Sequence, residues 1–146
     1  MNIWFAVLSY VLSFFVSTLV LVYLLQLPRW ITQQPDLVRE YYIQNAVQNL
    51  ILDFFLVAFY LAIASFFIWL CGFSHQHTLA LLTVVLTTII LSGSFFLYFG
   101  LKPVNDTFFS RWFHNAGWNA VVYDVILVAS IFVLYSILYE AFTCIQ

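Results

Sequence analysis

Charge is the property that this sequence has least of. Charged residues make up 7% of the 146, with four Lys or Arg against six Asp or Glu. Nucleic-acid binding needs a cluster of basic side chains to neutralise phosphates, and no such cluster is present. We therefore expect no nucleic-acid partner.

Cysteine, lysine and histidine are also scarce, which excludes several kinds of site. Cys71 and Cys144 are too few for a disulfide framework and lack the CxxC spacing of a redox or zinc site, although one bridge between them stays open. The only lysine, Lys102, flanks an apolar run, so no Schiff base forms inside one. The sequence has no GxSxG elbow and no histidine box. We expect no metal and no cofactor, and we favour a non-catalytic protein.

Hydrophobic residues dominate what is there. They form 65% of the chain and give a mean hydropathy of +1.04, far above soluble domains, which are about half apolar. A membrane-spanning helix needs roughly 20 apolar residues. Four runs meet this length, at about 3–27, 43–71, 78–101 and 119–142. The sequence thus predicts a single all-α domain over 1–146, an integral membrane four-helix bundle surrounded by lipid.

The four basic residues predict how these spans are oriented. Arg29 and Arg39 lie between the first and second runs, and Lys102 and Arg111 lie between the third and fourth. Basic residues concentrate in cytoplasmic loops, so both connections are predicted to be cytosolic and both termini non-cytosolic. The first apolar run is too long for a cleavable signal peptide, and we expect it to remain in the mature protein.

The first of these connections predicts an extended second helix. Pro35 suits the first position of a helix, so the second helix is expected to begin there and to project beyond the membrane.

The second connection predicts a short amphipathic helix. Asn105 or Asp106 is expected to cap it, and Gly117 to turn the chain into the fourth span. One face carries Phe108, Phe109, Trp112 and Phe113, and the other carries Ser110, Arg111 and His114. Such a helix is typical of the membrane interface, between spans three and four.

Small residues on the first span predict close helix packing. Ser9, Ser13 and Ser17 recur every four residues, so they share one face of the helix. Small side chains at this spacing let a neighbouring backbone approach closely.

A few polar residues inside the spans form the candidate site. Asn45, Asn49 and Asp53 follow one another at i, i+4 and i+8 on the second span, and Asp124 enters at a similar depth on the fourth. The candidate partners at the boundary are Arg111, His114 and Asn119. A carboxylate in the bilayer costs about 2.5–3.5 kcal/mol, so each needs a partner.

Three interpretations of this cluster stay open. In the first, Asp53 or Asp124 pairs with Arg111 and with the amides of Asn45, Asn49 and Asn119, and pins the short helix to the bundle. In the second, the cluster is a hydrated vestibule that binds a cation or a polar ligand. The third is catalysis by two aspartates, but Asp124 lacks the glycine-flanked context of intramembrane aspartyl proteases.

Two stretches resemble known families. The segment Asn45-Ala46-Val47-Gln48-Asn49, after Arg39, is similar to the N-x-x-E-N segment of the membrane-bound glutathione and eicosanoid metabolism family. That resemblance implies a trimer in which Arg39, Asn45, Gln48 and Asn49 contact glutathione, although Gln48 replaces the acidic position. Residues 92–135, with FFSRWF and AVVYDVILV, resemble uncharacterised small four-span membrane proteins of large DNA viruses of algae and protists. This second resemblance implies a viral or host membrane and no known activity.

Together these observations favour a non-catalytic multi-pass protein that organises a membrane or binds other membrane proteins, with a homo-oligomer as one option. A small oligomeric ion channel or transporter that uses Asp53 and Asp124 is the first alternative. A glutathione-dependent membrane enzyme is the second.

Overall fold

The computed structural model describes residues 3–144, which form helices and no strand. Four helices are long and apolar enough to cross a membrane, as expected. They are α1 (Ile3–Thr18) with its π-helical continuation η1 (Leu19–Leu24), α4 (Ala46–Leu70), α5 (His77–Gly100) and α7 (Trp118–Cys144). The shorter helices are α2 (Leu27–Thr32), α3 (Pro35–Arg39), the π-helical η2 (Glu40–Gln44) and α6 (Phe108–Ala116).

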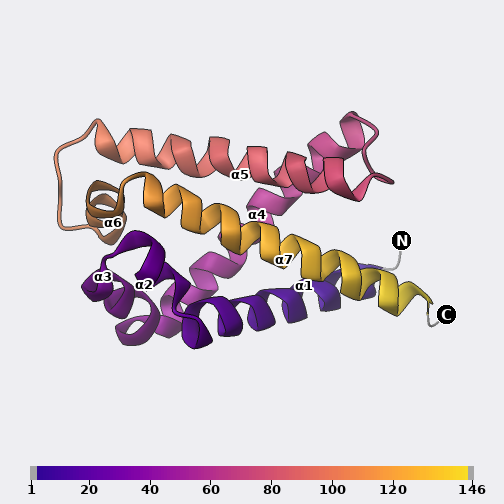
Figure 1. Ribbon diagram of the computed structural model, residues 1–146, viewed down its shortest axis with the longest axis horizontal. Helices are drawn as coiled ribbons and strands as arrows, with labels where there is room; N and C mark the ends of the chain where they lie inside the picture. The colour runs from indigo at the N-terminus through magenta and orange to yellow at the C-terminus, as the bar shows by residue number, and fades with distance from the viewer. Residues whose placement is uncertain (1–2, 145–146) are drawn as a thin grey trace.

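Helix α7 is the centre of the arrangement. It lies between α1 and α5 and packs along both of them, while α4 crosses behind at an angle and touches α7 much less (Figure 1). From the turn that joins them, α4 and α5 diverge toward the other end of the molecule (Figure 1). That other end carries the short helices α2, α3 and α6, opposite the two described ends of the chain.

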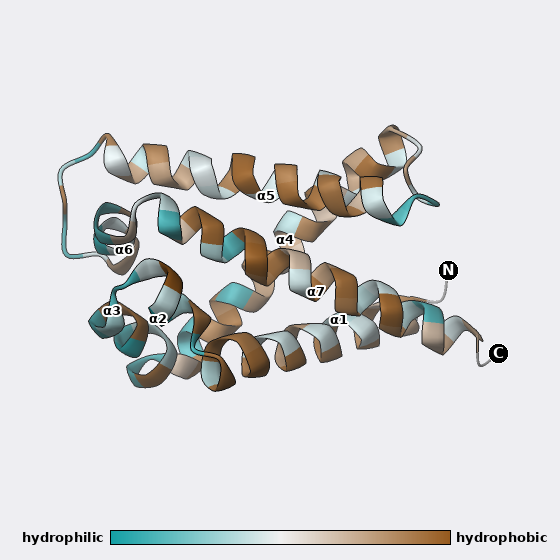
Figure 2. Cartoon of the chain, viewed as in Figure 1, coloured by the Kyte–Doolittle hydropathy of each residue, from teal (hydrophilic) through white to brown (hydrophobic). Residues whose placement is uncertain are grey.

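The outer surface of the long helices is apolar. Figure 2 shows brown, hydrophobic residues along their length, with hydrophilic residues gathered toward the two ends. More than half of the surface is exposed at several large apolar side chains: Phe55, Phe66, Leu86, Ile90 and Ile137. A surface of this kind is an aggregation liability in water and suits a hydrocarbon environment.

The first span ends slightly earlier than expected. Its helix stops at Leu24, not near residue 27, because Gln26 adopts a left-handed backbone with φ 50°. Pro28 then starts α2, where its fixed φ suits a first helical turn.

The second span is not one helix from Pro35. A helix does begin at Pro35, as predicted. The helical conformation is interrupted at Asn45, where φ is −115° and ψ is 29°, and α4 starts at Ala46. The segment before the break does not project from the molecule, because Leu37, Tyr41 and Tyr42 are all buried. The free energy gained by burying these side chains outweighs the cost of interrupting a straight helix.

The short helix α6 follows the sequence prediction in part. The cap position is occupied by Thr107 and not by the predicted Asn105 or Asp106, and Gly117 turns the chain with a positive φ of 57°. Trp112 and Phe113 are buried in the core of the protein, whereas the predicted interfacial helix would place this face on the membrane. Ser110 was expected on the polar face but is buried, and its hydroxyl accepts a hydrogen bond from the Asn105 amide at 3.2 Å.

Candidate functional site

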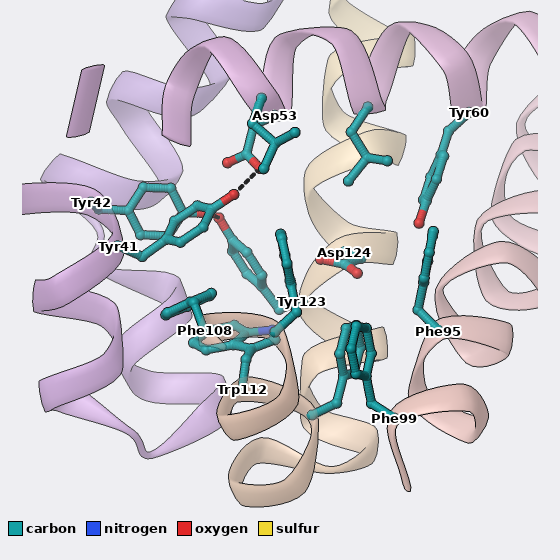
Figure 3. A pocket seen from close by; sticks show the side chains of 14 residues that line it. Tyr41, Tyr42, Asp53, Tyr60, Phe95, Phe99, Phe108, Trp112, Tyr123 and Asp124 are labelled. Carbon is teal, nitrogen blue, oxygen red and sulfur yellow. Dashed lines mark hydrogen bonds between the residues drawn. The ribbon is translucent and has the colours of Figure 1, made fainter. Parts of the chain in front are cut away.

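A cavity of about 250 Å³ lies among α4, α5, α6, α7 and η2, at the end that carries the short helices (Figure 3). Ten of the fourteen residues that line it are aromatic, and they come from all five elements. Asp53 and Asp124 reach it from α4 and α7, on different sides. None of the lining residues is Lys, Arg or His. The cavity is slightly smaller than the roughly 300–1,000 Å³ of common ligand pockets, so it suits a small ligand.

Asp53 is held by a tyrosine from the irregular segment before α4. The Tyr41 hydroxyl donates a hydrogen bond to Asp53 Oδ1 at 2.6 Å, drawn as a dashed line in Figure 3. Burial, and then the nearby Asp53 charge, raise the pKa of Tyr41. The phenol therefore keeps its proton and acts as a hydrogen-bond donor to the carboxylate.

Asp124 has a different neutral donor. The hydroxyl of Ser92, which is buried on α5, donates to Asp124 Oδ2 at 2.5 Å. A serine within an apolar run gives no sign of its partner, so this contact was not predicted from the sequence. It joins α5 to α7 beside the cavity and positions the carboxylate.

Two further tyrosines close one side of the cavity. The Tyr42 and Tyr123 hydroxyls lie 2.7 Å apart, and one donates to the other. Both side chains are buried, and the pair connects η2 with the start of α7. Because each hydroxyl already has a partner, this part of the wall is held rigidly.

Arg111 does not reach either aspartate, and the expected pairing with Asp53 or Asp124 is wrong. Its guanidinium donates from Nη1 and Nη2 to the two carboxylate oxygens of Glu40, at 2.9 and 2.6 Å. These hydrogen bonds lower the pKa of Glu40 and raise that of Arg111. Both side chains are about one-third exposed, so the ion pair forms where water still solvates it. An arginine carried into the cavity would lose that solvation.

The asparagines of the predicted stripe bind backbone and do not line the cavity. Asn49 Nδ2 donates to the Tyr41 carbonyl at 3.0 Å, and Asn45 Nδ2 donates to the Glu40 carbonyl at 3.2 Å. The break at Asn45 takes that residue off the helix that carries Asp53. Asn49 thus supports the site indirectly, because it holds the segment that carries Tyr41.

The other two boundary residues also lie apart from the aspartates. His114 Nδ1 makes a 2.8 Å hydrogen bond with the Ser110 carbonyl in its own helix. Asn119 is exposed at the start of α7. Of the predicted cluster, the structure brings only Asp53 and Asp124 to the cavity.

The cavity has a lateral side between the diverging helices α4 and α5. Leu52 on α4 and Phe95 on α5 both line it, and they keep 42% and 41% of their surface exposed. The outer surface of the long helices is apolar along their length (Figure 2). The cavity is therefore bordered by side chains that also face the surroundings of the protein.

The opposite end of the molecule offers little chemistry. His77 Nε2 lies 3.6 Å from Glu140 Oε1, and both side chains are well exposed. Cys71 and Cys144 are exposed and free. Among residues 3–144, no three His, Cys, Asp or Glu side chains come together in a group that could hold a metal ion.

No protein-family model matches the sequence, and comparisons with curated proteins and with solved structures found no match either. The two family resemblances therefore stay predictions. The cavity and its two carboxyl groups are the features that indicate a function.

Proposed function

We propose that the protein is a multi-pass membrane protein that binds a small ligand in the aromatic cavity, without catalysing a reaction on it. The observation that carries the proposal is that Asp53 and Asp124 line one cavity from two different helices and have only neutral hydrogen-bond donors. The lining residues include no His, Cys, Ser or Lys. They supply recognition groups and no nucleophile activated by a base.

The energetic cost of the two carboxylates supports a binding role. An ionised carboxylate inside a membrane protein needs compensation, because its burial costs several kcal/mol. The Tyr41 and Ser92 hydroxyls supply one hydrogen bond each but no positive charge. Arg111, which was expected to pair with one of these aspartates, pairs with Glu40. A ligand that completes the site would offset this cost, whereas an internal ion pair would have left the site inert.

In the membrane, the four long helices form a bundle with α6 at one interface. The connections with Arg29, Arg39, Lys102 and Arg111 lie at the end that carries the short helices, and the positive-inside rule assigns that end to the cytosol. Both termini are then non-cytosolic. The cavity lies near the cytosolic face in this orientation.

The alternative functions have less support. Past the cavity, the described interior includes buried apolar residues such as Ala64, Val84 and Ile131, which does not favour a polar path for an ion through a single chain. Arg39, Asn45 and Gln48 are exposed, and Asn45 and Asn49 bind backbone, which does not favour a shared glutathione site. Binding of a partner protein through a projecting second helix is not favoured, because the segment before Asn45 packs against the rest of the protein.

Intrinsic fluorescence tests the proposal, because Trp112 lines the cavity and the other four tryptophans do not. In a protein that keeps Trp112 alone, with Phe at positions 4, 30, 69 and 118, a small aromatic probe should change the emission saturably. A protein that keeps only Trp118, which is 56% exposed outside the cavity, is the matched control for partitioning into detergent. A change that never saturates, or that is equal in both proteins for every probe, would contradict the proposed function.

A further inference from the structure

We propose that the ligand is a small organic cation, an amine or quaternary ammonium with apolar substituents. This inference rests on the proposed function of the cavity and names the chemistry that it recognises. Asp53 and Asp124 place a carboxyl group on each of two sides, which carries negative charge when ionised, and aromatic rings form most of the remaining wall. The cavity thus combines the two features that attract such a cation, opposite charge and ring faces.

The aromatic wall favours a cation over a neutral guest. A ring carries negative electrostatic potential on its face, and aromatic cages are the common means of binding quaternary ammonium groups. Trp112 is the strongest such partner, and Tyr41, Phe108 and Phe99 come from neighbouring elements of the same wall. Tyr41 and Phe108 lie against each other, with ring centroids 4.6 Å apart. Desolvation in this environment strengthens the attraction of each ring for the charge.

The same wall is poorly suited to an inorganic cation. Calcium takes six to eight oxygen ligands and magnesium needs a near-octahedral set. The oxygens of this cavity are those of two aspartates and four tyrosines, and the hydroxyls of Tyr41, Tyr42 and Tyr123 are already engaged. A cation that brings its own apolar substituents needs far fewer ligands.

The size and the border of the cavity fit a compact, partly apolar molecule. A cavity of about 150 Å³ accommodates benzene, so about 250 Å³ leaves room for a phenyl group with a small ammonium head. Leu52 and Phe95 border the cavity on its side between α4 and α5. A cation with apolar substituents partitions to the membrane interface, and this side gives it a route that avoids the packed core.

A pair of probes with the same shape and different charge tests the inference. Phenyltrimethylammonium and tert-butylbenzene are titrated into the protein that keeps Trp112 alone, in a non-ionic detergent. We expect the cation to bind at least about tenfold more tightly than its neutral isostere. Asp53→Asn and Asp124→Asn should each remove most of this preference. The exposed loop variant Asp106→Asn is the matched control and should leave it unchanged.

The neutral probe also controls for folding. Each Asp→Asn variant keeps an oxygen that accepts the hydrogen bond from Tyr41 or Ser92, so tert-butylbenzene should bind the variants as well as it binds the parent. Equal affinity of the parent for both probes would overturn the cation inference and keep the proposed ligand cavity. A preference for the cation that survives in both variants would also overturn it. Saturable binding of neither probe would overturn the cavity function itself.

Discussion

The two sides of α7 show opposite ways of packing a helix. Toward α1, the contact is continuous, and the predicted stripe of Ser9, Ser13 and Ser17 is buried. Toward α4, there is little direct contact, and the space contains the cavity with its aromatic wall. The side of α7 that faces α1 is therefore a closely packed interface with small residues. The side that faces α4 is lined by large aromatic rings that leave a cavity.

The difference shows how residue size decides where a cavity forms between apolar helices. Small side chains allow backbones to approach, and they leave no space between them. Rings such as Trp112 and Phe113 are carried by α6 and line the space that separates α4 from the packed pair of α5 and α7 at one end. The aspartates lie where the helices are kept apart, which is where a carboxylate reaches a ligand.

The largest effect is expected when a fully buried ring is removed from α1, away from the cavity. Phe14 is 1% exposed and packs edge-on against Phe54, with ring centroids 5.2 Å apart. Phe14→Ala should lower the free energy of unfolding by about 3–5 kcal/mol, because it leaves a closed void. Phe95→Ala, on the cavity wall, is the matched variant. Its ring is 41% exposed, so its loss should cost about 1 kcal/mol or less.

Reversible unfolding in mixed detergent micelles measures both values. Equal losses from Phe14→Ala and Phe95→Ala would erase the contrast between a filled interface and an open one. A much larger loss from Phe95→Ala would show that the cavity wall is the more tightly packed region.

A change in the opposite direction, from small to large, should have the next largest effect. Ser13 is fully buried on α1, and its hydroxyl donates to the Ser9 carbonyl at 2.6 Å. Ser13→Leu adds volume where no space is available, so we expect a loss of about 1–3 kcal/mol. Val16→Leu, on the exposed face of α1, is the control and should change little. Equal stability of Ser13→Leu and Val16→Leu in the same unfolding assay would contradict close packing of this stripe.

The broad architecture could be predicted from the sequence because it depends on local properties. The length and apolarity of four runs, the amphipathic pattern of 108–116 and the turn at Gly117 all follow from the chain itself. What failed was the assumption of one straight helix from Pro35. The spacing of Asn45, Asn49 and Asp53 defines a single face only while the helix continues, and it breaks at Asn45.

The candidate site could be predicted only in part. Two intramembrane carboxylates are conspicuous in a chain with so little charge, so Asp53 and Asp124 were found. Their partners Tyr41 and Ser92 come from other elements, and ordinary aromatic and small residues give no local signal. The ion pair joins residues 71 positions apart, so Glu40 could be matched to Arg111 only once the fold had brought η2 and α6 together.

The smallest effect concerns that ion pair, which fastens α6 to η2 beside the cavity. Arg111 lowers the pKa of Glu40 below its usual 4.5, so the pair stabilises the folded state above that pH. The contribution is lost as the pH falls through the lowered pKa, where the folded protein takes up a proton. Because both side chains are about one-third exposed, we expect this contribution to be the smallest of the three effects. A double-mutant cycle of Glu40→Gln and Arg111→Gln isolates the coupling from other carboxyl groups. The coupling free energy should be present at pH 7 and decrease as the pH falls below 4.5, and a value that does not change on acidification would refute the pair. The cation preference of the cavity should persist in Glu40→Gln at pH 7, because this carboxylate lies outside the cavity wall.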